Sequence, residues 1–320
     1  VTEATETTAS TEETTTAATE STEETTEPTL DLFAEDGNVI ASGTCGAQGD
    51  NLTWTLTEDG TLTISGSGYM KNYSTSSVAP WYTKRAKILS VVVEDGVTSI
   101  GSCAFKDCLK LASVTLPEGM KSIGSRGFQN CTKLAEVTIP DSVTSIGHWA
   151  FAGCTGLTSI TIPNSVTSIV THDNYYRRGL SFMGCSSLTS VTIPQCILDE
   201  EVKYVFSESY EKLDSIFINE GATTIRGLSG CSGLTTVSIP SSATSIEESA
   251  FYDCWKMQRI VIPNGVTYIG SGAFESCTRL AEIIIPDSVA YIGGGAFLET
   301  AWYKAQPDGV VYAGKSLYKY

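Results

Sequence analysis

A 23-residue segment recurs along this chain with small changes. Val143–Ser165 reads VTSIGHWAFAGCTGLTSITIPNS, and its pattern returns in Met120–Ser142, Val97–Gly119 and Val266–Ser288. A fixed short period is typical of a solenoid, in which each unit buries its apolar side only against its neighbours. The repeat therefore predicts a stack of similar coils.

Each unit contains the spacing Leu-x-x-Ile-x-Ile, which predicts a short strand. Side chains alternate along a strand, so we expect Ile160 and Ile162 to point inward and Thr161 outward. Pro163 follows and ends the strand, because proline has no N–H to donate to the ladder. The strands of successive coils are predicted to form a parallel sheet along the stack.

Phenylalanine and cysteine stand three residues apart in a short turn of most units, and stacking the coils places like residue on like. The predicted phenylalanine column is Phe105, Phe128, Phe151, Phe182, Phe206, Phe251, Phe274 and Phe297. The predicted cysteine column is Cys108, Cys131, Cys154, Cys185, Cys231, Cys254 and Cys277. We expect these column thiols to be reduced and buried, because stacked parallel Cβ vectors do not offer disulfide geometry. Cys45, Cys103 and Cys196 lie off the column and are the candidates for a disulfide or a reactive thiol, with a Cys45–Cys103 bridge as one hypothesis.

The run A-F-x-x-C-x-x-L-x-x-V-x-I-P-x-x-V-x-x-I-G resembles the BspA-like (Treponema pallidum-type) leucine-rich repeat family of bacterial surface proteins, over roughly residues 38–320. The resemblance implies a repeat solenoid with a right-handed coil, a parallel β-sheet and short helical turns, built from about nine 23-residue units. It implies less about the partner, because the surface residues of a solenoid decide what it binds.

Composition and periodicity divide the chain into four parts. These are a disordered Thr/Glu-rich linker at 1–29, an N-terminal cap at 30–87, leucine-rich repeats at 88–297 and a C-terminal cap at 298–320. The linker holds eight Glu and no Lys or Arg, which is half of the net charge of −16. Such a segment cannot bury enough apolar area to offset its ordering entropy. Its threonines are candidate O-glycan sites, and a plain spacer is the alternative.

The N-terminal cap is predicted to contain a β-hairpin. Apolar residues alternate with threonine over 52–56, Glu-Asp-Gly turns the chain at 58–60, and apolar residues alternate again over 62–64. The first repeat strand is predicted at Ser90–Val93. A bare first strand would be an aggregation-prone edge, so we expect the hairpin to cover it.

The middle of the repeat region departs from the period. Eight extra residues lie within 170–179, and the units over 195–242 are irregular, which favours a local kink or change of curvature there. The inserted loop contains Tyr175, Tyr176, Arg177 and Arg178. Tyr and Arg are enriched at binding hot spots, although a tolerated insertion with no function explains the loop equally simply.

The outward position of the predicted strands forms one row along the sheet. That row is Val92, Thr115, Thr138, Thr161, Thr192, Phe217, Ser238, Val261 and Ile284. Its second half becomes apolar, and Tyr268 and Tyr291 share one position on the return side of successive units. Exposed apolar and aromatic surface marks interaction sites, whereas β-branched residues also simply suit a strand. The predicted partner-binding residues are Tyr175, Tyr176, Arg177, Arg178, Phe217, Val261, Ile284, Tyr268 and Tyr291.

The sequence indicates no catalytic, cofactor-binding or metal-binding residue. The two histidines, His148 and His172, lie in different units and have no motif partner. The metalloprotease, P-loop, dinucleotide and nucleophile-elbow motifs are absent, so we expect no enzyme and no cofactor. An acidic chain argues against nucleic acid as a partner, and no run approaches the ~20 apolar residues of a membrane span.

We therefore expect an extracellular or cell-surface protein that binds another macromolecule. The resemblance implies adhesion to proteins of a host or of other bacteria. The alternative is a carbohydrate-binding or scaffold module of a larger extracellular polysaccharide-degrading system, with Tyr268 and Tyr291 as the sugar-stacking residues. The chain starts at Val1 without a basic segment and an apolar run, so we expect any signal peptide to be absent from this sequence.

Overall fold

The computed structural model describes residues 38–169, 181–307, 311–313 and 316–319. They fall within one of the two units of the chain, Gly37–Tyr320. The predicted loop residues Tyr175, Tyr176, Arg177 and Arg178 lie outside the described residues.

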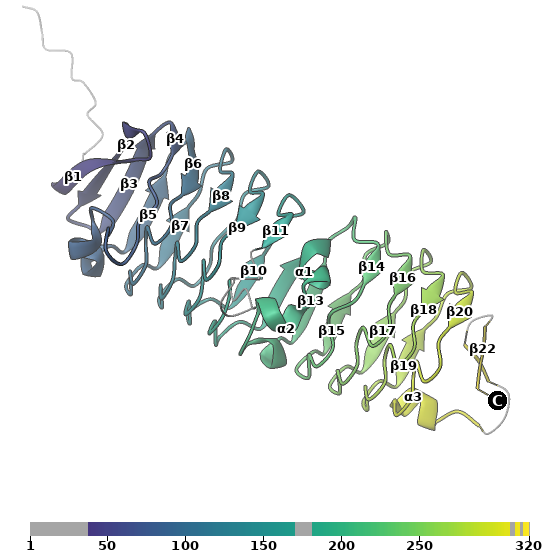
Figure 1. The fold of residues 1–320 in the computed structure, drawn as a ribbon. Coiled ribbons are helices and arrows are strands. Elements are labelled where there is room, and N and C mark those ends of the chain that lie inside the picture. The colour runs from purple at the N-terminus through teal and green to yellow at the C-terminus, as the bar shows by residue number, and fades with distance from the viewer. Residues whose placement is uncertain (1–37, 170–180, 308–310, 314–315, 320) are drawn as a thin grey trace, which may run out of the picture. The chain divides into compact units, whose positions relative to one another are not determined.

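The repeats form a β-solenoid of stacked parallel strands, as the period predicted (Figure 1). One side of the coils carries the main ladder. Its repeat strands are β5 (Ser90–Val93), β7 (Ser113–Thr115), β10 (Ser159–Thr161), β12 (Ser190–Ile193), β13 (Ser215–Ile218), β15 (Thr236–Ser238), β17 (Arg259–Val261) and β19 (Glu282–Ile284). Ile160 and Ile162 are buried and Thr161 is exposed, so the predicted alternation is confirmed.

A second, return-side ladder runs along another side of the same coils. Its strands are β4 (Gly68–Tyr69), β6 (Val97–Ile100), β8 (Ser122–Ile123), β9 (Ser145–Ile146) and β11 (Ser168–Ile169), then β14 (Thr224–Ile225), β16 (Ser245–Ile246), β18 (Tyr268–Ile269) and β20 (Tyr291–Ile292). The pairing is in register, with Ser122 beside Ser145 and Tyr268 beside Tyr291. Residues at one repeat position therefore stand in rows along the surface.

The phenylalanine column is confirmed. Consecutive rings from Phe105 to Phe206, and again from Phe251 to Phe297, stack with centroids 5.1–5.5 Å apart. Leu228 is fully buried in the coil between these two runs. Such aromatic pairs contribute about 0.5–1.5 kcal/mol beyond their buried area, so the column ties each coil to the next.

A tryptophan closes the column at each end. Trp81 stacks on Phe105 with centroids 5.4 Å apart, and its Nε1–H donates to the carbonyl of Ala104 over 2.8 Å. At the other end the Trp302 ring meets Phe297 edge-on at 5.1 Å. Trp81 directly precedes the short helix η1 (Tyr82–Lys87), and Trp302 lies within α3 (Ala301–Lys304).

The cysteine column is buried, and all ten cysteines are free thiols in the structure. The thiol of Cys131 donates to the carbonyl of Phe105 at 3.3 Å, and the thiol of Cys154 donates to that of Phe128 at 3.2 Å. The hypothesis of a Cys45–Cys103 bridge is wrong for this structure, because Cys45 is buried and its thiol contacts the carbonyl of Thr53 at 3.9 Å.

The predicted hairpin is present as β2 (Gly49–Thr57) and β3 (Thr61–Gly66). β3 pairs in parallel with β5, so the hairpin does cover the first repeat strand. A third strand, β1 (Val39–Gly46), was not predicted from the sequence, and it pairs antiparallel with β2. At the other end of the unit, β21 (Val311–Ala313) and β22 (Ser316–Lys319) form a small antiparallel pair.

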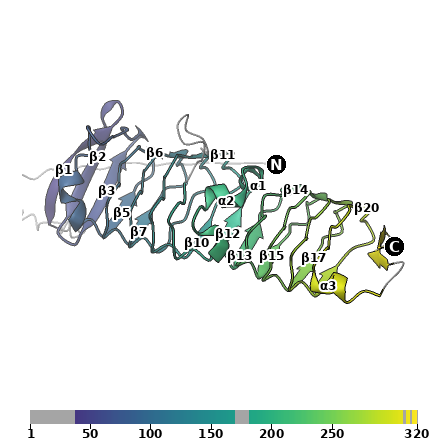
Figure 2. The same cartoon turned by 60° about the horizontal axis from the view of Figure 1, so that its bottom comes forward.

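Helices replace a strand of the return-side ladder in the irregular middle units. These are α1 (Gln195–Asp199), α2 (Val202–Val205) and η2 (Tyr210–Lys212), and two views place α1 and α2 in the middle of the stack (Figures 1 and 2). The Gln195 side-chain amide accepts from the N–H groups of Thr223 (3.1 Å) and Thr224 (3.2 Å) and donates to the carbonyl of Thr224 (2.9 Å). One side chain thus satisfies the edge of β14, where the ladder restarts.

Candidate functional site

The outward row of the main ladder carries three exposed apolar side chains. Phe217 is 40% exposed, Val261 49% and Ile284 42%. Val261 and Ile284 stand directly opposite each other on β17 and β19, and we call them the apolar pair. Phe217 lies in register between Thr192 and Ser238, so polar residues flank it on both sides.

An ion pair lies two residues before the apolar pair on the same strands. The Nε of Arg259 is 3.0 Å from the Oε1 of Glu282, and both side chains are exposed. An exposed pair of this kind contributes little to stability. Its effect here is to leave the border of the apolar pair without net charge.

The two predicted tyrosines form a stacked pair on the return-side ladder. The rings of Tyr268 and Tyr291 are 5.1 Å apart and nearly parallel, at 5°. They are 37% and 52% exposed. The same row continues toward the middle of the molecule as Ser245 and Thr224.

The described candidates therefore do not form one cluster. The apolar pair and Phe217 belong to the main ladder, whereas Tyr268 and Tyr291 belong to the return-side ladder. The sequence predicted exposed positions for these five residues and placed the two tyrosines on the return side, as the structure does.

One partly buried aromatic cluster was missed from the sequence. Arg126 and Trp149 occupy the same turn position of successive coils, with the guanidinium 4.3 Å from the ring, and His148 stacks beside Trp149 at 4.4 Å. Both Arg126 and Trp149 have φ of +57°, where the later units place Gly272 and Gly295. A residue with a Cβ is strained in this conformation. The replacement of glycine by Arg126 and Trp149 at this repeat position could have indicated the cluster from the sequence.

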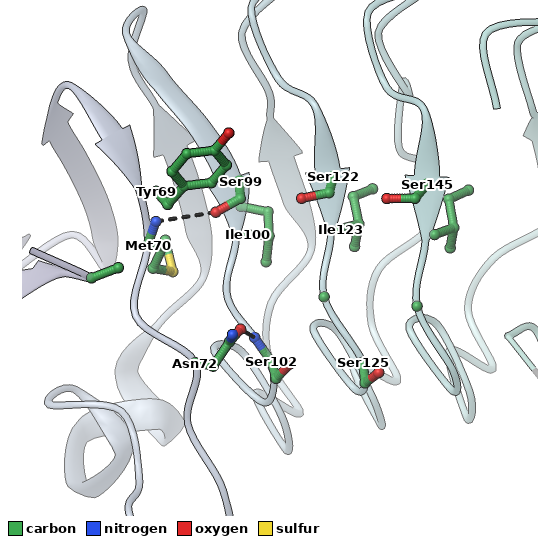
Figure 3. A pocket seen from close by; sticks show the side chains of 14 residues that line it. Tyr69, Met70, Asn72, Ser99, Ile100, Ser102, Ser122, Ile123, Ser125 and Ser145 are labelled. Atoms are coloured by element: carbon green, nitrogen blue, oxygen red, sulfur yellow. Dashed lines mark hydrogen bonds between the residues drawn. The ribbon is translucent and has the colours of Figure 1, made fainter. Parts of the chain in front are cut away.

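A groove on the return side of the N-terminal half was also missed. It has a volume of about 410 Å³, and Tyr69, Ser99, Ser122 and Ser145 line it together with the turns that follow their strands (Figure 3). Glycines hold these turns close together: a Cβ on Gly124 would lie 2.6 Å from the backbone nitrogen of Ser102. The bare backbone leaves a hollow beside the serine row.

The pKa values of Glu220 and Cys231 are shifted by contacts within the fold. Hydrogen bonds from the backbone N–H and hydroxyl of Ser241 lower the pKa of the Glu220 carboxyl. Burial raises the pKa of the Cys231 thiol to about 12. Over the described ranges, no three His, Cys, Asp or Glu side chains gather as a metal site. No helix in that same part is long and apolar enough to cross a membrane.

Several solved structures of bacterial leucine-rich repeat proteins resemble this chain. The protein from Eubacterium ventriosum is 21% identical, with 87% of this chain and 100% of the other covered and a TM-score of 0.40. The Treponema pallidum leucine-rich repeat protein is 20% identical, with coverage of 74% and 91% and a TM-score of 0.37. A protein from Bacteroides ovatus is 23% identical, with coverage of 78% and 91% and a TM-score of 0.30.

A search among curated proteins gave no significant match. The model of the BspA type leucine rich repeat region matches six copies, over residues 81–195, 178–229 and 202–306. Because these matches span most of the chain, the protein belongs to the BspA-type leucine-rich repeat family.

Proposed function

We propose that this protein is a non-enzymatic binding scaffold that docks another protein on the outer face of its main ladder. The observation that carries the proposal is the apolar pair, Val261 and Ile284, exposed side by side on β17 and β19. After Val92 in the first unit, the same row is threonine up to Thr192, as at Thr161, so the fold itself does not require an apolar residue there. Exposed apolar side chains that the fold does not need support a contact with a partner.

The flanking charges suit a protein partner as well. Arg259 and Glu282 give the border of the apolar pair one positive and one negative group. An apolar centre with a polar rim is the usual anatomy of a protein interface. The stacked strands hold this surface rigidly, which lowers the ordering cost of binding.

The proposal extends to location and to the type of partner. The chain would act outside the cell or on its surface and would adhere to a protein of a host or of another bacterium. The family assignment supports this, and the loop residues Tyr175, Tyr176, Arg177 and Arg178, together with Phe217, are proposed as further contacts. The acidic chain argues against nucleic acid as the partner.

A second candidate function is carbohydrate binding within a larger extracellular polysaccharide-degrading system. The parallel rings of Tyr268 and Tyr291 favour it, because flat exposed aromatic faces stack on sugar rings. This candidate uses the return-side ladder, so it can be separated experimentally from the apolar pair.

Capture of a partner by the full chain tests both candidates. The wild type, a Val261→Thr/Ile284→Thr variant and a Tyr268→Ala/Tyr291→Ala variant would be presented to surface proteins and to a glycan panel. We expect a protein partner whose affinity falls about tenfold or more with the threonine variant, since hot-spot truncations cost about 2 kcal/mol or more. A Thr161→Ser/Thr192→Ser variant, in the same row of other coils, is the matched control.

A protein partner that binds the threonine variant as tightly as the wild type would contradict docking on the apolar pair. Capture of a glycan alone, lost with the two tyrosines, would replace the proposal with the carbohydrate module.

A further inference from the structure

We propose that the groove lined by Tyr69 and the serines of β6, β8 and β9, the serine groove, binds a neutral linear oligosaccharide (Figure 3). The site lies on the return-side ladder of the N-terminal half. The apolar pair and the two tyrosines, Tyr268 and Tyr291, belong to coils of the C-terminal half. The inference is independent of the proposed protein-binding function.

The serine groove presents one chemical group repeatedly. Ser99, Ser122 and Ser145 are in register on consecutive strands, and Ser102 and Ser125 repeat in the turns that follow the first two. Figure 3 shows the hydroxyls of Ser122 and Ser145 pointing toward the preceding coil, the side on which Tyr69 lies. Neighbouring strands repeat at about 4.8 Å, so a ligand that matches this array is itself a repeating chain rich in hydroxyls.

The hydroxyls that line the groove beyond Ser99 are available for a ligand. Ser99 accepts the N–H of Met70 at 3.1 Å, whereas the hydroxyls of Ser122 and Ser145 have no protein partner within the described residues. Outside the groove the hydroxyl of Thr144 is occupied, because it donates to the carbonyl of Lys121 at 3.2 Å. A serine hydroxyl both donates and accepts, as a sugar hydroxyl does.

An aromatic ring stands at the end of the serine row. Tyr69 pairs with Ser99 in the ladder and is 57% exposed, among the most exposed of the large apolar and aromatic side chains. A free phenol ring offers a flat apolar face for the C–H face of a sugar ring. The aromatic face can pack on the C–H face of a pyranose while the serine row reaches the hydroxyls around its edge.

The groove does not suit the other common extended ligands. Its lining contains no Lys, Arg, Asp or Glu, so neither a phosphate backbone nor a charged peptide finds a counter-charge. Its backbone groups are also committed between coils: the N–H of Gly124 donates to Ile100, and that of Gly147 donates to Ile123, each at 2.8 Å. A peptide added as a strand would have no main-chain partners on this face.

A second observation extends the site beyond Tyr69. The groove adjoins a hollow of about 380 Å³ at Ala47, which lines both. Tyr73 lines this second hollow, is only 7% exposed, and its hydroxyl has no hydrogen-bond partner within the described residues. A buried hydroxyl without a partner costs about 1–3 kcal/mol, and a sugar hydroxyl in this hollow would satisfy it only if the Tyr73 ring turned its hydroxyl into the hollow.

Titration of the full chain with neutral hexasaccharides tests the proposal. The probes are β-1,4-glucose, β-1,3-glucose and β-1,4-mannose hexamers, with a sulfated hexasaccharide and an uncharged hexapeptide as comparisons. We expect at least one neutral hexamer to bind, with affinity lowered about tenfold by Tyr69→Ala and also lowered by Ser122→Ala/Ser145→Ala. These side chains are exposed or half-buried, so both variants are expected to fold.

A matched control separates this site from the others on the molecule. Tyr252→Ala removes another exposed tyrosine, which lies outside every binding surface proposed for this protein, and should not change hexamer binding. Failure of every neutral hexamer to bind, or binding that both groove variants leave intact, would overturn the proposal. Tyr69→Ala and Ser122→Ala/Ser145→Ala change different coils. If one of these variants does not fold, hexamer binding by the other still tests the proposal.

Discussion

The cysteines show how a single residue type can be chosen by the repeat geometry. The column thiols are small enough for the coil interior, and five of the seven donate to a carbonyl of the preceding coil, as Cys185 does to Phe151 at 3.3 Å and Cys277 to Phe251 at 3.1 Å. Valine would fill a similar space but would lose this hydrogen bond, and the carbonyl would keep only the backbone N–H that it also accepts, as Phe151 does from Cys154. The repeat period predicted the cysteine column, and the thiol hydrogen bonds give a reason for cysteine at this position.

Thiol reactivity follows from this burial. Burial raises the pKa of Cys108 and of Cys231 from the ordinary 9.0 to about 12, so the unreactive thiol form persists at neutral and mildly alkaline pH. Because the unfolded chain releases these protons above pH 9 and the native state retains them, stability is expected to fall as the pH rises past 9. At pH 8 a thiol reagent should modify Cys103, which is half-buried and off the column, and should reach the column only in denaturant. A Cys103→Ser variant is the control. Rapid labelling of column cysteines in the native protein would show that burial does not protect these thiols.

At the scale of elements, the regular parts were predictable and the irregular parts were not. The strands, the hairpin and the stacked columns follow from a strict period, because every coil repeats the same local choice. β1 was missed since its segment carries little alternation of apolar and polar residues. α1 and α2 are five and four residues long, too short to show a helical period.

The candidate sites divide in the same way. Val261, Ile284, Tyr268 and Tyr291 were visible as departures from a row of Ser and Thr. Tyr69 was not, because it belongs to the cap and enters the row only through its pairing with β6. Which residues share a surface depends on how the strands of successive units pair in space, and the period alone does not place a cap residue such as Tyr69 in a row.

The Gln195 side chain forms the hydrogen bonds that a neighbouring strand would otherwise give to β14, so we expect its loss to destabilise the protein. Gln195→Ala removes three hydrogen bonds to the edge of β14 and should lower the free energy of unfolding by about 1–2 kcal/mol. Gln258→Ala, at an exposed position, is the matched control. Urea unfolding at fixed pH measures the difference, and equal stabilities of the two variants would show that the edge needs no such cap.

Two stacked aromatic runs, Trp81 to Phe206 and Phe251 to Trp302, lie in the core with the buried Leu228 between them and hold the coils against one another. The surfaces vary along this constant core: serine rows and Tyr69 in the N-terminal half, the apolar pair and the stacked tyrosines in the C-terminal half. A solenoid with one core and several different faces is suited to binding more than one kind of ligand.

We propose above that the outer face of the main ladder at Val261 and Ile284 docks a protein partner. Amide hydrogen exchange of the full chain, alone and with the captured partner, tests this docking most directly. We expect slower exchange on binding in β17, β19 and the residues that flank them, with the serine groove unchanged. Protection confined to other coils, with β17 and β19 exchanging as in the free chain, would contradict it.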